Sequence, residues 1–179
     1  MKHWIQTFTG KVFSLENPHP SMVCIEDIAH ALSRICRYTG HVNREHYSVA
    51  QHCVEMSYVV EPEFALWALL HDATEAYISD LAAPIKRMQE MDAYCQLEWE
   101  VERIVCESLG IHPDGPMREA VKIADLRMLI TEAQQLLTWP PPQDWEIDAE
   151  PYDIVLDEWS PEWAKASYLD RYVEFAGGK

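Results

Sequence analysis

The strongest constraint in this chain is an apolar run that ends in ionisable side chains. Residues 64–70 are all apolar, and Pro62 before them suits the first turn of a helix. A helix that is apolar on every side is normally buried in a core. The run continues directly into His71 and Asp72, and Glu75 follows three residues later. Burying these groups unpaired would cost several kcal/mol, so they must have partners or bind a ligand.

Two further ionisable residues lie on apolar helical faces. A buried His-Asp pair taken alone is more often a structural pair than a site, and a histidine among core residues usually has a structural role. Here, however, His52 shares a helical stripe with Val49, Cys53 and Met56. Asp125 interrupts the apolar stripe of a later helix. Three predicted helices therefore each place an imidazole or a carboxylate on an inward face.

One divalent metal ion would satisfy all of these groups. The predicted ligands are His52, His71, Asp72 and Asp125. Two nitrogens and two or more carboxylate oxygens suit Mn, Fe, Co, Ni or Zn better than Ca. With four protein ligands, an octahedral ion keeps one or two positions open for water and substrate. Such an ion activates a bound water at neutral pH and polarises a phosphoryl oxygen.

The order His … His-Asp … Asp resembles that of the HD-domain metal-dependent phosphohydrolases. Four segments carry the resemblance: Ser48-Val-Ala-Gln-His52, His71-Asp72-Ala-Thr-Glu75, Ser79-Asp80-Leu-Ala-Ala-Pro84-Ile-Lys86 and Lys122-Ile-Ala-Asp125. Within that superfamily the chain most resembles the small bacterial HD-type 5′-deoxynucleotidases and their phage relatives, which include dATP triphosphohydrolases. The resemblance covers roughly residues 25–135. It implies an all-α orthogonal helical bundle, the metal ligands named above and a tendency to form homo-oligomers.

The resemblance also assigns roles around the metal. Glu75 would orient the attacking water or handle its proton. Asp80 would protonate the departing 5′-oxygen or activate water. Arg37 and Lys86 would balance the charge of the phosphate. The structural alternatives are a surface ion pair of Glu75 with Arg37 or Lys86, and a solvated face formed by Lys86-Arg87.

Residues upstream of His52 suggest the substrate. Arg37 and Tyr38 stand where the deoxynucleotidases have an Arg-Trp pair, whose Arg contacts phosphate and whose ring excludes a 2′-hydroxyl. Tyr38 would pack on deoxyribose in place of the Trp. Gly40 would leave space near the base, where a bulkier residue is expected in an adenine-specific relative. The expected substrate is therefore a small-molecule deoxynucleotide without strict adenine selection.

Several functions remain open at this point. The first is hydrolysis of 5′-deoxynucleotides, either of dNMPs to deoxynucleoside and phosphate or of dNTPs to deoxynucleoside and triphosphate. Another is a phage-type dATP triphosphohydrolase. A different HD chemistry, such as hydrolysis of cyclic nucleotides or ppGpp, is disfavoured by the Arg37-Tyr38 spacing. A non-catalytic HD module that binds a nucleotide is disfavoured by the complete ligand set together with Glu75 and Asp80.

The remaining sequence predicts one domain over residues 1–179. Residues 4–13 suggest a small β-hairpin that turns at Thr9-Gly10. Helices are expected from residue 25 to about Tyr38-Thr-Gly40, from a capping box at Ser48, over residues 91–109, from Pro116 onward, and over 161–176. Residues 139–160 should form a long acidic loop over the surface.

Composition limits the partners and the compartment. The net charge of −16 argues against a general nucleic-acid binder. No apolar run approaches the length of a membrane span, and the first ten residues lack the features of a signal peptide. The five cysteines include no CxxC pair and are expected to be reduced thiols. We therefore expect a cytoplasmic protein.

Overall fold

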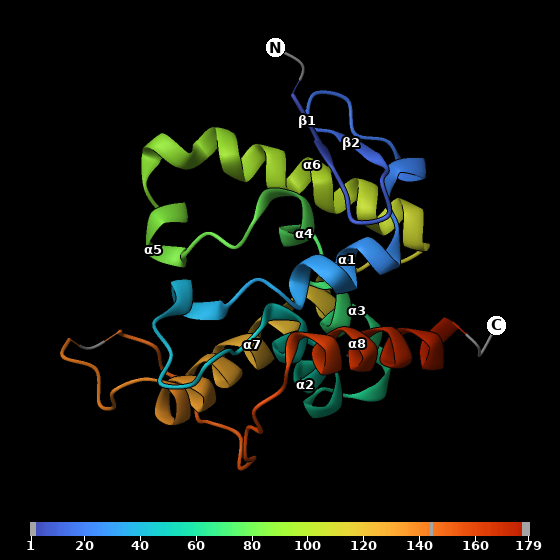
Figure 1. The fold of residues 1–179 in the computed structure, drawn as a ribbon. Helices are drawn as coiled ribbons and strands as arrows, with labels where there is room; N and C mark the ends of the chain where they lie inside the picture. The colour runs from blue at the N-terminus through green and yellow to red at the C-terminus, as the bar shows by residue number, and fades with distance from the viewer. Residues whose placement is uncertain (1–2, 144, 177–179) are drawn as a thin grey trace.

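The computed structural model describes residues 3–143 and 145–176. These residues form mostly α-helix, with a two-stranded sheet near the N-terminus (Figure 1). The strands are β1 (Trp4–Gln6) and β2 (Val12–Ser14), and the helices are α1 (Ile25–Leu32), α2 (Val49–Val59), α3 (Ala65–Leu70), α4 (Glu75–Ile78), α5 (Ala83–Lys86), α6 (Asp92–Leu109), α7 (Gly115–Leu136) and α8 (Pro161–Ala176). The predicted all-α class and the small N-terminal hairpin are confirmed. Within the described ranges, no helix has both the length and the apolar character needed to cross a membrane.

The hairpin is antiparallel, and Phe13 anchors it in the core. Ile5 pairs with Phe13 across the two strands. Gly10 takes a positive φ of 85°, which suits the predicted turn. Phe13 is fully buried and stacks on Tyr77 of α4, with ring centroids 4.0 Å apart. The hairpin therefore covers the side of the molecule next to α1 and α4.

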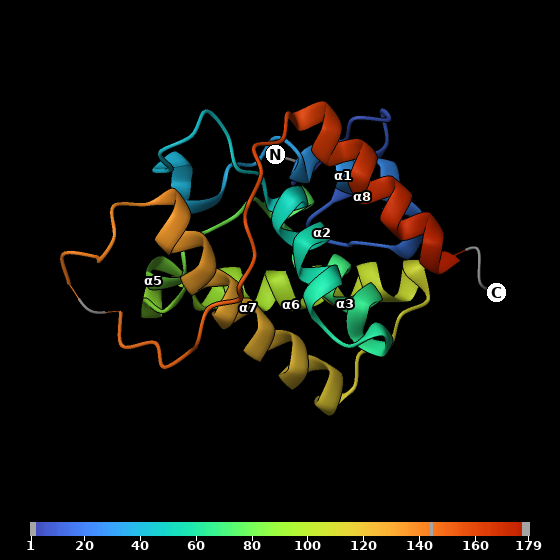
Figure 2. The same cartoon turned by 90° about the horizontal axis from the view of Figure 1, so that it is seen from below.

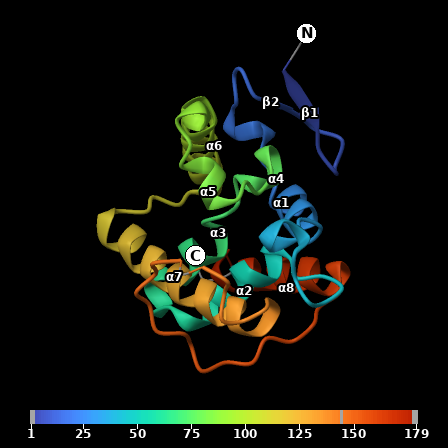
Figure 3. The ribbon, with the colours of Figure 1, turned by 90° about the vertical axis from the view of Figure 1, so that its left-hand side faces the viewer.

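Helix α2 is the centre of the packing. It contacts α1, α3, α7 and α8, and α1 in turn packs on α4 and α8. Figure 2 shows α2 running alongside α8, and Figure 3 places the hairpin and α6 on one side of the molecule and α2, α7 and α8 on the other. Val49, Ala50, Cys53 and Met56 of α2 are fully buried. A side chain on this helix is therefore held by neighbours on several sides.

Three of the predicted helix starts and stops are confirmed by their local hydrogen bonds. Ser48 Oγ accepts the N–H of Gln51 at 3.1 Å at the start of α2. The Gln51 side chain does not complete the capping box, because its amide donates to Glu55 and to the Asp157 carbonyl instead. Helix α6 ends at Gly110 with φ 67°, and Ser160 Oγ accepts the N–H of Trp163 at 3.2 Å at the start of α8.

The predicted end of the first helix, near Tyr38-Thr-Gly40, was wrong. Helix α1 ends at Leu32. Residues 35–37 instead form backbone hydrogen bonds with residues 47–49, which lead into α2. Arg37 N–H donates to Tyr47 O at 2.9 Å, and Val49 N–H donates to Ile35 O at 3.0 Å. This contact lies between residues distant in sequence, so the apolar periodicity at 25–36 could not reveal it. A 3₁₀ turn follows over Arg37–Gly40.

The long predicted loop contains no regular element in its described part, but it is tied to α7. Arg127 donates to Glu150 O at 2.9 Å, and Gln135 donates to Ile154 O and accepts from Leu156 N–H. Leu156 is almost fully buried. The loop is thus a strap rather than a free surface segment.

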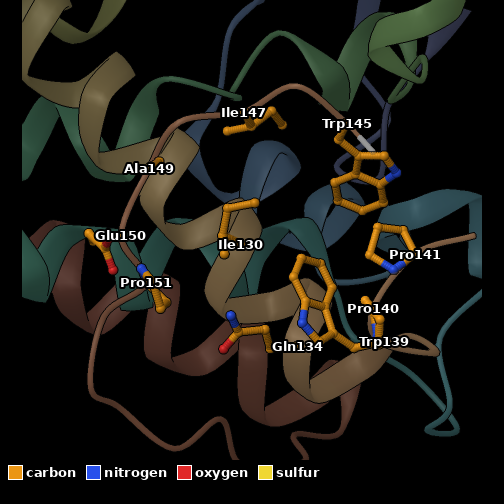
Figure 4. Close-up of a pocket in the computed structure, with 10 residues that line it drawn as sticks. All are labelled: Ile130, Gln134, Trp139, Pro140, Pro141, Trp145, Ile147, Ala149, Glu150 and Pro151. Atoms are coloured by element: carbon orange, nitrogen blue, oxygen red, sulfur yellow. The ribbon is translucent and has the colours of Figure 1, made fainter. Parts of the chain in front are cut away.

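A pocket of about 440 Å³ lies between α7 and this loop (Figure 4). Trp139 and Trp145 meet there edge to face, with ring centroids 6.3 Å apart. Ile130 and Gln134 form its helical wall. At roughly 100° per residue, these two positions lie on the opposite side of α7 from Asp125. The pocket is therefore separate from the predicted metal ligands.

Candidate metal site

His71 and Asp72 sit where the buried helix α3 ends. The apolar run draws α3 into the core, and His71 follows its last residue, Leu70. His71 Nδ1 lies 2.8 Å from the carbonyl oxygen of Ala68. A carbonyl oxygen only accepts, so Nδ1 carries the proton and the neutral ring has its lone pair on Nε2. That lone pair points away from α3 toward α2.

His52 faces His71 from the centre of α2. Its side chain is fully buried, and its Nδ1 lies 2.5 Å from Oε1 of Glu132. Its Nε2 lies 3.4 Å from Nε2 of His71 and 3.3 Å from Oδ1 of Asp125. Asp72 Oδ2 lies 3.4 Å from His71 Nε2 and 3.8 Å from His52 Nε2. Four side chains from α2, α7 and the end of α3 thus converge on one small volume.

The protein groups alone leave an excess of electron pairs in that volume. The two Nε2 atoms and the oxygens of Asp72 and Asp125 all offer lone pairs, so a proton or a cation must lie between them. Burial lowers the pKa of His52 and the charge of Arg37 lowers it further, but Glu132 and Asp125 outweigh both and raise it to about 9. Against the effect of burial, the hydrogen bond and the charge of His52 lower the pKa of Asp125. With the protein groups alone, one proton is held here.

The donor set fits a divalent metal ion. One ligand atom each from His52, His71 and Asp72 lie within 4.8 Å of one another. Two imidazole nitrogens with a carboxylate oxygen suit a first-row transition metal. Asp125, the fourth predicted ligand, adjoins this group through His52, and its side chain is 40% exposed. The buried His52-His71-Asp72 group can therefore hold a metal ion, which would take the place of the proton.

Glu75 and Asp80 lie beside this group. Glu75, at the start of α4, is buried, and its Oε2 has no hydrogen-bond partner among the described residues. Burial raises the pKa of Glu75, and the charges of Asp72 and Asp80 raise it further. Burial also raises the pKa of Asp80, although the charge of Arg37 opposes it. Both carboxyl groups therefore hold a proton to higher pH than a surface carboxyl does.

Arg37 and Tyr38 reach the same region from the 3₁₀ turn. Arg37 Nη1 lies 3.7 Å from Asp72 Oδ2. The Tyr38 hydroxyl donates to Glu132 Oε2 at 2.9 Å and lies 3.2 Å from the Leu129 carbonyl. Tyr38 and Thr39 have φ of 55° and Gly40 has φ of 80°. Consecutive left-handed residues are strained unless their surroundings fix them, and such strain is concentrated at functional sites. A Cβ on Gly40 would meet no atom within 4 Å.

Lys86 has a different partner. Its Nζ lies 2.6 Å from Oε1 of Glu98 on α6, and about a quarter of each side chain is exposed (25% and 26%). Burial lowers the pKa of Lys86, but the hydrogen bond and charge of Glu98 raise it overall. The structure thus joins Lys86 to α6, and a phosphate would have to compete with Glu98 for it.

Sequence reasoning missed Glu132. This residue is fully buried and accepts from Arg37, Tyr38 and His52, and the Tyr47 hydroxyl lies 3.0 Å from its Oε1. The charges of Arg37 and His52 lower its pKa although burial alone would raise it. A signal was available, because Glu132 follows Asp125 by seven residues and so lies on the same face of the helix.

Comparison with known proteins gives two relatives. No family model matches the chain. It is 44% identical over 133 residues to the uncharacterized protein YfdR of Escherichia coli K12, a match that spans 74% of this chain and 72% of that protein. It is 32% identical over 147 residues to the uncharacterized protein RCAP_rcc00048 of Rhodobacter capsulatus, with shares of 74% and 72%.

Proposed function

The chain belongs to the family of the Escherichia coli protein YfdR, and we propose that it is a metal-dependent phosphohydrolase of 5′-deoxynucleotides. One observation carries the proposal. His52 Nε2 and His71 Nε2 face each other 3.4 Å apart beside the carboxylate of Asp72, and the guanidinium of Arg37 lies next to that carboxylate. This arrangement provides a cation site with an anion-binding group at its edge.

The metal would supply a polarised phosphoryl oxygen and a water that ionises near neutral pH. The identity proposed for it is Mn, Co, Fe, Ni or Zn, in agreement with a donor set of two imidazoles and two carboxylates. His52, His71 and Asp72 would hold it, with Asp125 as the fourth ligand. All four groups come from helices or a helix end, which fixes their positions better than a mobile loop would.

The other residues would bind the phosphate and move protons. Arg37 Nη1 lies 3.7 Å from Asp72 Oδ2, so it would donate to the phosphate of a substrate held beside Asp72. Glu75 and Asp80 have raised pKa values, which suit groups that exchange protons near neutral pH. Glu75 would orient the attacking water and handle its proton. Asp80, which is less deeply buried, would protonate the departing 5′-oxygen.

Tyr38 would select the sugar. Its hydroxyl donates to Glu132, so the ring has little freedom to swing aside. A ring held in this way can pack on C2′ of a deoxyribose and exclude a ribose hydroxyl. The open space at Gly40 supports acceptance of more than one base.

The test is product analysis. Purified protein is incubated with Co²⁺ or Mn²⁺ and each dNMP, dNTP, ribonucleotide and cyclic nucleotide separately, with the His71→Ala/Asp72→Ala double variant as control. Free phosphate from several dNMPs would establish a broad 5′-deoxynucleotidase, and triphosphate from several dNTPs a dNTP triphosphohydrolase. Triphosphate from dATP alone would refute the inference from Gly40. Hydrolysis of no deoxynucleotide would refute the proposal, and binding without turnover would indicate a sensor.

A further inference from the structure

We propose that Glu132 is a positioning residue that holds the metal ligand His52 with one carboxylate oxygen and the substrate-facing pair Arg37 and Tyr38 with the other. The role given to Arg37 and Tyr38 rests on the proposed function, whereas the role toward His52 needs only the metal site. Glu132 thereby makes metal binding and substrate binding depend on one buried carboxylate.

The two oxygens of Glu132 have separate partners. Oε1 accepts from His52 Nδ1 at 2.5 Å, and the Tyr47 hydroxyl lies 3.0 Å from it. Oε2 accepts from Arg37 Nε at 3.0 Å and from the Tyr38 hydroxyl at 2.9 Å, and Arg37 Nη2 lies 3.0 Å from it. Glu132 is fully buried, so water does not compete for these bonds. The charge of Arg37 compensates the buried carboxylate, which would otherwise be costly.

The bond to His52 fixes which ring nitrogen is free. An ionised carboxylate only accepts, so His52 Nδ1 carries the proton and Nε2 keeps the lone pair that a metal needs. Groups that orient a metal-binding histidine in this way typically contribute 10–100-fold to metal affinity. Glu132 also aligns the ring, because Arg37 and Tyr38 fix its own position.

The bonds to Oε2 fix the other half of the site. The Arg37 guanidinium is tied to Glu132 through two of its nitrogens, which leaves Nη1 directed toward Asp72. The Tyr38 hydroxyl ties a strained turn with φ of 55° to α7. Without Glu132 this turn would lose a partner that keeps it in an unfavourable backbone conformation.

Replacing Glu132 by Gln discriminates because an amide has only one oxygen. If the amide NH₂ faces His52, that ring must accept at Nδ1 and carry its proton on Nε2, where the metal would bind. If the NH₂ faces Arg37 and Tyr38 instead, its N–H groups meet the guanidinium of Arg37 and the hydroxyl of Tyr38, which are themselves donors. The hydrogen bonds that hold the guanidinium are then lost. Either orientation damages one half of the site, although the size of the side chain is unchanged.

The first measurement is metal affinity without substrate. Titration calorimetry with Co²⁺ should show a 10–100-fold weaker affinity for Glu132→Gln than for the wild type when the amide faces His52. If the amide faces Arg37 instead, Co²⁺ affinity stays near the wild-type value while KM for the deoxynucleotide rises at least about tenfold. The control is Glu55→Gln, because Glu55 accepts from Tyr47 and Gln51 but does not touch His52. It should change neither quantity more than about threefold.

A second measurement does not depend on any variant. In the wild type loaded with Zn²⁺, long-range ¹H–¹⁵N correlation spectra should show His52 protonated at Nδ1, with that proton far downfield because the bond to Glu132 is short. An unprotonated Nδ1 would overturn the proposal even if Glu132→Gln fails to fold.

The remaining outcomes separate the two proposals. A folded Glu132→Gln with unchanged Co²⁺ affinity and unchanged KM overturns the positioning role, and so does an equal loss in Glu55→Gln. A wild type that binds Co²⁺ but hydrolyses no deoxynucleotide refutes the proposed function alone, and the affinity and the spectra then decide the role of Glu132 toward His52.

Discussion

The proton held by His52 should make the stability of the metal-free protein fall as pH rises above neutrality. In the folded protein the pKa of His52 is about 9, against an ordinary value of 6.5. Burial and Arg37 oppose this rise, and Glu132 and Asp125 produce it. Because the folded pKa is the higher one, the stabilisation is fully present below pH 6.5 and is lost as pH rises to 9.

The magnitude follows from the two pKa values. A difference of one pKa unit corresponds to 1.36 kcal/mol, so the interval from 6.5 to 9 gives about 3 kcal/mol in total. Between pH 7 and 8.5 the free energy of unfolding should fall by about 1.2 kcal/mol for each pH unit, because the unfolded state is still partly protonated at pH 7 and the folded state is partly deprotonated at pH 8.5. His52 is fully buried, so solvent does not screen this effect.

Urea unfolding at several fixed pH values, in the presence of a chelator, measures this slope. Glu75 also has a raised pKa and contributes a decline of the same sign, so the experiment uses the Glu75→Gln variant to remove its contribution. Measurements stop at pH 8.5, because ordinary cysteine thiols titrate near 9. Saturating Co²⁺ should abolish the decline, because metal and proton compete for Nε2. A free energy of unfolding that stays constant within about 0.5 kcal/mol from pH 7 to 8.5 would refute this account of His52.

Three further predictions concern single substitutions. Burial and its acidic neighbours raise the pKa of Glu75, so the uncharged amide of Glu75→Gln suits this site. The variant should therefore change the free energy of unfolding at pH 7 by less than about 1 kcal/mol, while steady-state assays should show kcat lowered at least about 100-fold. Ser160→Ala removes the cap of α8 and should cost about 1 kcal/mol, seen as a fall in Tm of about 2–4 °C; an unchanged Tm would contradict the cap. Gly40→Ala should cost about 1–2 kcal/mol because φ is +80°, although a Cβ there meets no atom within 4 Å; equal urea midpoints for the variant and the wild type would show that the turn is not strained.

The sequence was sufficient where structure depends on neighbours along the chain. The caps at Ser48 and Ser160, the stop at Gly110 and the turn at Gly10 all follow from side-chain chemistry within a few residues. The apolar run before His71 predicted a buried helix, and α3 is one. The same reasoning identified the residue types of the candidate metal site, because a buried imidazole or carboxylate on an apolar face is costly wherever it occurs.

Only the tertiary structure decided how distant segments share their polar groups. Helix α1 ends early because residues 35–37 pair with residues 47–49, and Lys86 joins α6 because Glu98 lies within reach. Glu132 was visible as an acidic residue on the face of Asp125, but its partners come from the 3₁₀ turn and from the region of α2. Periodicity shows which side of a helix faces inward. It does not show which charge from another part of the chain meets it there, and the free energy of a buried carboxylate depends on that partner.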